Sequence, residues 1–286
     1  MPASEPAAQI ASIDPSHEQA RFWRVSSVTE VELLYAKYVH FSFDKHYHEE
    51  YALGVVETGI HAFWYRGGFH TGSPGQIVTY QPGEIHNGQA GSDEIWRYRM
   101  FYISADYIRQ LCDDHHLPAG TTPFLNQTII EDATTAYWLR RLHQEFEAQS
   151  LTLERQVLLN YILTDFLLRY SDTTLPIPAK THEAKSIQQV IAYIHAHFLE
   201  DITLDELAQV AHLSKSYLIR AFRNLVGLSP YSYLVQVRLN QARLLLRQGH
   251  PISQVAQDTG FADQSHFTRY FRRALGVTPG QYLQKS

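Results

Sequence analysis

The C-terminal third of this 286-residue chain nearly repeats itself, and the repeat restricts the fold more than any other feature. Residues 207–227 align with residues 255–276 when the second copy is allowed one extra residue in its turn. In this alignment Arg220 matches Arg269, and Gly227 matches Gly276. Two copies of a short segment indicate a paired structural unit rather than a solenoid, which needs at least three repeats.

Each copy carries the start and stop signals of a helix, a turn and a second helix. In the first copy, Thr203 and Glu206 form a capping-box pattern, and Ser214 caps the helix that Gly227 ends. The corresponding cap and stop in the second copy are Asp263 and Gly276. Apolar residues expected to face inward recur at helical spacing in both copies: Leu204, Leu207, Ala208, Ala211, Leu218, Phe222, Leu225, Phe267 and Phe271. The pattern predicts two helix-turn-helix units.

The outward faces of the two second helices carry basic, amide and hydroxyl side chains. These are Lys215, Ser216, Ile219, Arg220 and Arg223 in the first copy, and Gln264, Ser265, His266, Thr268, Arg269, Arg272 and Arg273 in the second. Arginine can bind guanine through two hydrogen bonds, glutamine can do the same with adenine, and hydroxyls suit either base. A merely solvated helix face usually mixes both charges, but neither face has an acidic residue after its cap. The pattern therefore favours a DNA interface.

Charge is distributed unevenly along the chain. From Thr181 onward there are 11 Lys and Arg against 7 Asp and Glu, whereas residues 1–180 have 13 against 22. The overall charge of −5 alone argues weakly against a nucleic-acid partner. An acidic N-terminal part joined to a basic C-terminal part is, however, the asymmetry expected when only one end meets phosphate.

The C-terminal region, from about Ile187 to Leu283, resembles the AraC/XylS family of transcriptional regulators. The resemblance rests on three segments, Ile252–Phe261, Phe267–Arg273 and Gly276–Tyr282. It implies that one rigid helix joins the two units and that they enter successive major-groove segments on one DNA face. Here that helix would run from about residue 231 to residue 247, or roughly 25 Å at about 1.5 Å per residue. This length suits two reading helices about one DNA turn apart.

Carried over position by position, the resemblance assigns DNA contacts to the outward faces described above. The predicted DNA-binding residues are Lys215, Ser216, Ile219, Arg220, Arg223, Gln264, Ser265, His266, Thr268, Arg269 and Arg272. Ile219 departs from the polar residue often found at its position, and it would favour a thymine methyl group or contribute little.

The N-terminal part has the pattern of a β-rich domain between residues 22 and 104. Its aromatic and β-branched runs are separated by Gly and Pro turn signals: 31–43, 51–57, 61–65, 76–80 and 95–103. Many short strands of this kind predict a small barrel or jelly roll. Two amphipathic helices are expected at 134–149 and 153–170, and their stripes either cover the barrel or form a dimer seam. Thr135, Leu139, Leu142 and Phe146 mark the first stripe. Leu153, Val157, Tyr161 and Leu168 mark the second stripe, which Leu158, Ile162 and Phe166 widen.

Two segments of the β region, His46–Gly54 and Gly75–Asn87, resemble the two cupin motifs and the barrel sensor domain attached to many AraC/XylS regulators. His46, His48 and His86 are expected to converge in the barrel mouth, because alternate strand residues share a face. Aromatic walls and an arginine that holds a carboxylate would complete an effector pocket. The predicted effector-binding residues are His46, His48, Glu50, Trp64, His86, Tyr98 and Arg99.

Two other interpretations of the histidines stay open. His46, His48 and His86 suit a divalent metal such as zinc, iron, nickel or copper. Metal-binding cupins usually add a glutamate four or five residues after the second histidine, but Ala52 and Leu53 stand there, and only Glu50 offers a substitute. The histidines would otherwise make structural hydrogen bonds alone. No cofactor is therefore predicted with certainty, and a barrel metal is the alternative.

The predicted fold class is α+β, a cupin-like β-barrel or jelly roll with two flanking helices followed by an all-α double helix-turn-helix domain. We expect a mobile arm at 1–20, the sensor and dimerisation domain at 21–170, a linker at 171–182 and the DNA-binding domain at 183–286. The single cysteine, Cys112, and the lack of a long apolar run or signal segment fit a cytoplasmic protein without a membrane partner.

The predicted function is a sequence-specific, effector-controlled transcriptional regulator that is not an enzyme. Its expected partners are double-stranded DNA, a small-molecule effector, a second copy of the chain and RNA polymerase. The alternative is a metal-dependent cupin enzyme that carries a DNA-binding domain. The incomplete metal set and the complete pair of helix-turn-helix units favour the regulator.

Overall fold

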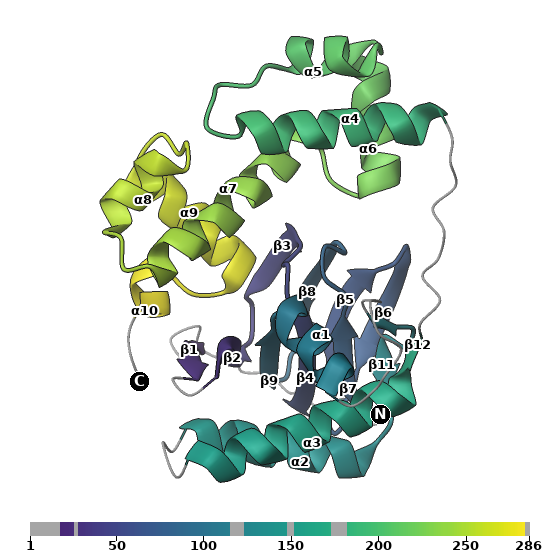
Figure 1. The fold of residues 1–286 in the computed structure, drawn as a ribbon, viewed down its shortest axis with the longest axis vertical. Coiled ribbons are helices and arrows are strands. Elements are labelled where there is room, and N and C mark those ends of the chain that lie inside the picture. Colours follow the sequence, from purple (N-terminus) through teal and green to yellow (C-terminus); the bar gives the residue numbers. More distant parts are fainter. Residues whose placement is uncertain (1–17, 26–27, 115–122, 148–151, 173–181, 284–286) are drawn as a thin grey trace, which may run out of the picture.

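The computed structural model describes residues 18–25, 28–114, 123–147, 152–172 and 182–283 (Figure 1). Its strands are β1 (Gln19–Val25), β2 (Val28–Tyr38), β3 (Ser42–His46), β4 (Tyr51–Thr58), β5 (His61–Tyr65), β6 (Gly68–Gly72), β7 (Ile77–Tyr80), β8 (His86–Ala90), β9 (Trp96–Ile103), β10 (Phe124–Leu125), β11 (Ile129–Ile130) and β12 (Ser171–Asp172). Its helices are α1 (Ala105–Asp114), α2 (Ala133–Glu147), α3 (Thr152–Tyr170), α4 (His182–His197), α5 (Leu204–Ala211), α6 (Lys215–Val226), α7 (Pro230–Arg247), α8 (Ile252–Asp258), α9 (Gln264–Leu275) and α10 (Pro279–Leu283). This is the α+β arrangement that the sequence predicts.

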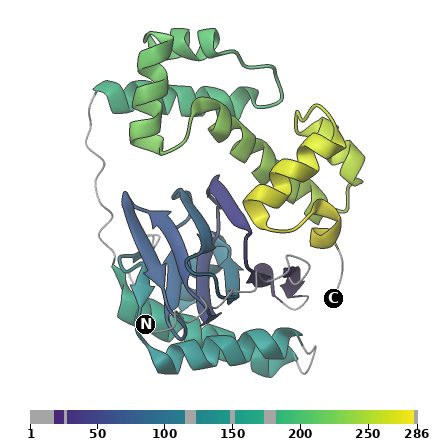
Figure 2. The same cartoon turned by 180° about the vertical axis from the view of Figure 1, so that it is seen from behind.

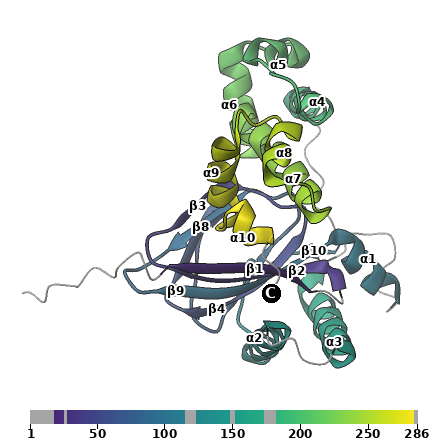
Figure 3. The ribbon, with the colours of Figure 1, turned by 90° about the vertical axis from the view of Figure 1, so that its left-hand side faces the viewer.

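The N-terminal strands form two antiparallel sheets that face each other, and we call this part the β domain (Figure 3). One sheet has the order β1-β2-β9-β4-β7-β11, the other has the order β3-β8-β5-β6, and β10 pairs with β12. Aromatic side chains from both sheets fill the space between them, among them Phe63, Tyr80, Trp96 and Tyr98. The interior of the β domain is therefore packed with rings.

The predicted run at 31–43 is wrong as one strand, because the chain turns between β2 and β3. The carboxylate of Glu18 accepts hydrogen bonds from the backbone N–H groups of Val39, His40 and Phe41 at 3.0, 2.7 and 2.8 Å. Their donors therefore point at one oxygen instead of at a neighbouring strand. The predicted arm also needs correction, since residues 19–20 belong to β1, while residues 1–17 lie outside the described part.

Helices α2 and α3 cover one side of the β domain, together with α1, which the sequence did not predict (Figures 1 and 3). The inward residues predicted for α2, Leu139, Leu142 and Phe146, are buried. The stripe predicted for α3 is wrong as an inward face, since Val157, Tyr161 and Leu168 are each more than 60% exposed and the side chain of Leu153 is outside the described part. The face that packs on the β domain is Leu159, Ile162, Leu163, Phe166 and Leu167. Both faces of α3 are apolar, so spacing alone did not decide between them.

The C-terminal helices contain the two predicted helix-turn-helix units, α5–α6 and α8–α9, joined by α7. The Thr203 and Glu206 capping box forms as predicted, and the Ser214 and Asp263 side chains cap α6 and α9. Gly227 and Gly276 end these helices in the left-handed conformation, with φ of 84° and 77°. The expectation for Leu225 is wrong, since this side chain is half exposed beside a hollow described below.

The two units differ in what they pack against. The first unit shares a separate core with α4 and the start of α7, which contains Val190, Leu218 and Phe222. The second unit continues the core of the β domain, because Phe267 and Phe271 belong to the same cluster as the rings between the sheets. Figure 2 shows α8, α9 and α10 resting on the edge of the β domain, whereas α4 and α5 stand clear of it.

Candidate nucleic-acid interface and effector site

The first reading helix, α6, projects most of its predicted DNA-binding residues into solvent. Lys215, Ser216, Arg220 and Arg223 are exposed, and Ile219 is half-buried. The Lys215 ammonium group lies 2.9 Å from Asp205 of α5, so its charge is already shared. Arg220 and Arg223 make no ion pair in the described part of the chain, so either can reach a base or a phosphate.

The second reading helix, α9, presents a longer polar face. Gln264, Ser265, Arg269 and Arg272 are exposed, and Thr268 is half-buried. His266 differs, because its ring packs against Tyr270 with 4.8 Å between centroids and its buried Nδ1 has no hydrogen-bond partner among the described residues. The structure thus brings together every predicted residue of this face except His266. The ring of His266 packs against Phe261, in the turn between α8 and α9, and against Tyr270.

The β domain reaches this second reading face. A hollow of about 750 Å³ is lined by Gln264, Ser265, Thr268, Arg269 and Arg272 together with Phe41 from the turn between β2 and β3. At the same junction Tyr38 donates a hydrogen bond to the carbonyl of Gly276 at 3.1 Å, and Arg273 pairs with Asp44 at 2.8 Å. In this arrangement the face that would enter a DNA groove has a β-domain side chain beside it.

A buried group of charges also joins the two domains, and we call it the interdomain charge cluster. Its members are Glu32, Glu50, Arg243, Arg247 and Tyr282. Arg243 of α7 binds Glu50 through two hydrogen bonds of 3.0 and 2.9 Å and Glu32 through a third of 2.7 Å. Burial acts to raise the pKa of Glu50, but the charges of Arg243 and Arg247 outweigh it and hold the pKa well below its usual range. The pKa of Glu32 is lowered and those of Arg243 and Arg247 are raised in the same way, so the two carboxylates and the two guanidinium groups are charged at neutral pH.

The three histidines predicted to converge do lie together inside the β domain. The ring of His86 is 4.5 Å from that of His46 and 4.8 Å from that of His48, between centroids. Each ring donates its Nδ1 hydrogen to a nearby backbone carbonyl, those of Asp44, Glu50 and Glu84. Burial lowers the pKa of His46 and His48 to about 4, so both are neutral at neutral pH.

This arrangement does not support the metal alternative. Among the residues that the structure describes, no group of three or more His, Cys, Asp or Glu side chains is placed to hold a metal ion. Glu50, the substitute for the missing cupin glutamate, is bound to Arg243 and Arg247 instead. A space of about 20 Å³ lies beside the histidines, and His46, His86 and Tyr98 are among the residues that line it.

Two other predicted effector residues lie elsewhere. Arg99 is on the outer face of its sheet, where it pairs with Glu57 at 2.7 Å and donates to His143 at 3.0 Å. Trp64 is on β5 but points away from the histidines, into a hollow between the β domain and the C-terminal helices. Since Glu50 belongs to the interdomain charge cluster, the predicted set is divided among four places.

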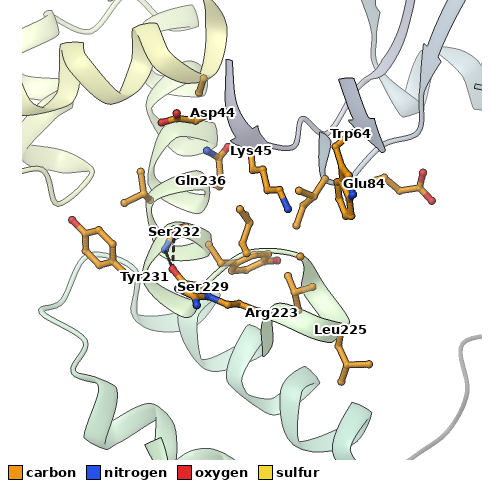
Figure 4. Close-up of a pocket in the computed structure, with 18 of the residues that line it drawn as sticks. Asp44, Lys45, Trp64, Glu84, Arg223, Leu225, Ser229, Tyr231, Ser232 and Gln236 are labelled. Carbon is orange, nitrogen blue, oxygen red and sulfur yellow. Dashed lines mark hydrogen bonds between the residues drawn. The ribbon is translucent and has the colours of Figure 1, made fainter. Parts of the chain in front are cut away.

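The hollow that contains Trp64 has a volume of about 1220 Å³, and we call it the interdomain hollow (Figure 4). Lys45 lies 4.0 Å from the centre of the Trp64 ring, and Arg223 approaches from α6 on the opposite side. Neither cation has a carboxylate partner in the described part of the chain. Tyr231, Tyr233, Ile85 and Leu225 add aromatic and apolar walls. Sequence reasoning missed this site, because its two halves are far apart in the chain.

Two models of known protein families match this chain. Residues 29–163 match the AraC-like ligand binding domain, and residues 207–285 match a helix-turn-helix domain. An uncharacterized HTH-type transcriptional regulator, YbfI of Bacillus subtilis, is 28% identical over 226 residues, covering 78% of this chain and 81% of its own. The HTH-type transcriptional activator RhaS of Salmonella schwarzengrund is 28% identical over 255 residues, covering 85% of this chain and 88% of its own.

A solved structure has the same fold. A variant of apo ToxT from Vibrio cholerae superimposes with a TM-score of 0.57 at 14% identity, and the match covers 89% of this chain and 97% of ToxT. The likeness includes both the N-terminal sheets and the C-terminal helices. No helix among the described residues is long and apolar enough to cross a lipid bilayer.

Proposed function

Because this chain belongs to the AraC family of transcriptional regulators, we propose that it binds a specific DNA operator through α6 and α9 under the control of a small organic acid. The observation that carries the proposal is the pair of capped helices whose exposed faces hold arginines, glutamine and hydroxyls without an acidic residue. Such side chains read base edges in the major groove. We infer regulation rather than catalysis as its activity, with RNA polymerase as a further partner in the cytoplasm.

The interdomain hollow is the effector site we infer. Its volume of about 1220 Å³ lies somewhat above the usual range of small-molecule pockets, about 300–1,000 Å³, so it has room for such a ligand, whereas the space of about 20 Å³ beside the histidines does not. Lys45 and Arg223 suit the carboxylate, and Trp64 and Tyr231 suit an apolar or aromatic body. A ligand held by both cations would touch the β domain and α6 together, which gives it a way to change the position of the first reading helix.

The second helix-turn-helix unit, α8–α9, is docked on the β domain, and we infer that this contact also controls DNA binding. In this arrangement Phe41 lines the same hollow as Gln264 and Arg269, and the interdomain charge cluster holds α7 on the β domain. A DNA duplex needs the space on that side of α9. We infer that the docked arrangement has low DNA affinity and that release of the second unit raises it.

A direct test has two stages. Duplexes selected by the full chain from a random library should share a sequence, and the chain should bind them at least a thousandfold more tightly than random DNA. A thermal-shift screen of the full chain against aromatic and aliphatic carboxylic acids should then raise the melting temperature with some members. Loss of that shift in Lys45→Met and in Arg223→Met, but not in the double variant His46→Ala with His48→Ala, would support the interdomain hollow. The opposite pattern would return the effector to the histidines.

We also propose that the chain forms a homodimer through the outer face of α3. Val157, Tyr161 and Leu168 lie on this face and are exposed. Single exposed apolar side chains are ordinary, but a group of them on one helix face marks a contact site between proteins. A dimer would place two DNA-binding domains on one operator and double the length of sequence that is read.

A further inference from the structure

Three arginines surround a second, smaller hollow on the β domain. Arg97 comes from β9, and Arg140 and Arg141 come from α2, which lies on the side of the β domain away from α4 and α5 (Figure 1). The hollow has a volume of about 380 Å³, and its remaining lining is Glu57, Thr58, Tyr137 and Gln144. We call it the arginine hollow. It lies in the acidic part of the chain, where residues 1–180 carry 22 Asp and Glu against 13 Lys and Arg.

The positive charge of this hollow is largely uncompensated. Glu57, its one acidic lining residue, is bound by Arg99 at 2.7 Å and faces that partner instead. Arg141 shares its charge with Glu145 of the same helix at 2.8 Å. Arg140 contacts only the Tyr137 ring, 6.0 Å from its centre, and makes no ion pair in the described part of the chain.

Arg97 provides the observation that separates this hollow from an ordinary solvated surface. Its side chain is half-buried, and its Nε is fully buried without any hydrogen-bond partner among the described residues. A buried N–H group without an acceptor destabilises the state that contains it, so native proteins rarely keep one without a reason. Solvation explains two exposed arginines on a helix, but it does not explain a partly buried third one that lines the same hollow.

Guanidinium groups in this arrangement match one class of ligand. The planar fork of arginine binds carboxylate and phosphate through paired, charge-assisted hydrogen bonds. An oxyanion between Arg97 and Arg140 would accept hydrogen bonds from the guanidinium groups that line the hollow and would reduce the repulsion among the three cations. The volume of the hollow fits a small metabolite rather than a polymer. We propose that the arginine hollow binds a small oxyanion, a phosphate or a carboxylate group, at a site separate from the interdomain hollow.

The test is calorimetric titration of the full chain with inorganic phosphate and, separately, with citrate, at an ionic strength held constant with chloride. The expected result is saturable binding of at least one of the two anions, and the tighter one identifies the group that the site takes. Arg140→Met and Arg97→Met should each weaken this binding at least tenfold. Arg140→Met is the cleaner variant, because this side chain is exposed and its loss leaves no buried partner.

Two matched controls separate this site from other cations. Arg109→Met removes an exposed arginine of α1, and Lys45→Met removes a cation of the interdomain hollow, so both should leave anion binding unchanged. Linear, non-saturable heats, or equal binding by the wild type and Arg140→Met, would overturn the proposal. Weakening by Lys45→Met instead of Arg140→Met would show that the anion occupies the interdomain hollow, and it would overturn the proposal as well.

Discussion

Arg243 and Glu50 form an ion pair with two hydrogen bonds, and it is buried between the β domain and α7, the helix that joins the two DNA-binding units. The two hydrogen bonds measure 3.0 and 2.9 Å, and the side chains are 5% and 9% exposed. Glu50 follows His48 by two residues, and the His48 ring donates to the Glu50 carbonyl at 2.9 Å. The interior of the β domain is therefore connected to α7 through one short segment, which gives events in one domain a route to the other.

Replacement of Arg243 by methionine should release the second unit and raise DNA affinity without an effector. Removing one member of a buried pair costs about 3–5 kcal/mol, because the other charge stays buried without its partner. Part of that cost destabilises the docked arrangement relative to the released one, which we infer binds DNA more tightly. We therefore expect about tenfold tighter operator binding, within the usual range of coupling between sites. The measurement is fluorescence anisotropy with a selected duplex.

The direction of this effect distinguishes the proposal from simple electrostatics. Arg243→Met removes a positive charge from the DNA-binding domain, so simple electrostatics predicts weaker binding. Arg21→Met is the control, because Arg21 of β1 pairs with Glu147 of α2 and this pair does not include the C-terminal helices. Unchanged or weaker operator binding by Arg243→Met, with a normal circular dichroism spectrum, would contradict the role of the cluster as a restraint.

Arg269→Ala should weaken binding to the selected operator by about 1–3 kcal/mol while random DNA loses little. Arg269 is exposed on α9 and lies on the face with Gln264 and Ser265, where a side chain reaches base edges. Electrophoretic mobility shifts with both duplexes measure the two losses. Arg140→Ala, on the far side of the β domain, is the control. Equal losses on both DNAs would assign Arg269 to phosphate rather than to a base.

Features set by neighbours in the chain could be predicted from the sequence. The caps at Thr203, Ser214 and Asp263 and the stops at Gly227 and Gly276 depend on residues within one helical turn, and each forms as expected. The convergence of His46 and His86 was predictable as well, because strand alternation places side chains on one face.

Features that depend on distant partners could not be predicted. Glu18 ends β2 by binding the backbone 21 to 23 residues away, and nothing in its local sequence marks it as a turn former. Glu32 and Arg243 are 211 residues apart, and the spacing of neither residue indicates an ion pair. The choice between the two apolar faces of α3 likewise depends on the surface of the β domain, which a periodicity cannot describe.

Tyr161→Glu should convert the proposed dimer into a monomer. Tyr161 is 70% exposed at the middle of the outer face of α3, and a carboxylate there would lose hydration if a second copy covered it. The expected result in multi-angle light scattering is a mass of one chain, against two for the wild type at the same concentration. Leu199→Lys changes a comparably exposed residue outside the β domain and should leave the mass unchanged. A wild-type chain that is already monomeric at micromolar concentration would refute the α3 dimer.

His61→Phe should make the β domain less sensitive to acid. His61 is buried against Trp96, with 4.3 Å between ring centroids, and burial lowers its pKa to about 3. In the unfolded chain a histidine titrates near pH 6.5, so between pH 6.5 and pH 3 the unfolded state holds a proton that the folded state lacks. The free energy of unfolding therefore falls as the pH drops below 6.5, by about 2 kcal/mol for this residue between pH 7 and pH 5.

Phenylalanine keeps the ring but has no proton to bind. At pH 7 the variant should lose about 1 kcal/mol, because the Tyr80 hydroxyl gives up its long contact with His61 at 3.4 Å. At pH 5 the variant should equal or exceed the wild type, since it avoids the protonation cost. Urea unfolding followed by tryptophan fluorescence at both pH values measures the difference, and His40→Gln, at an exposed position, should keep the wild-type pH dependence. Parallel curves for His61→Phe and the wild type would show that the His61 proton does not distinguish the folded from the unfolded state.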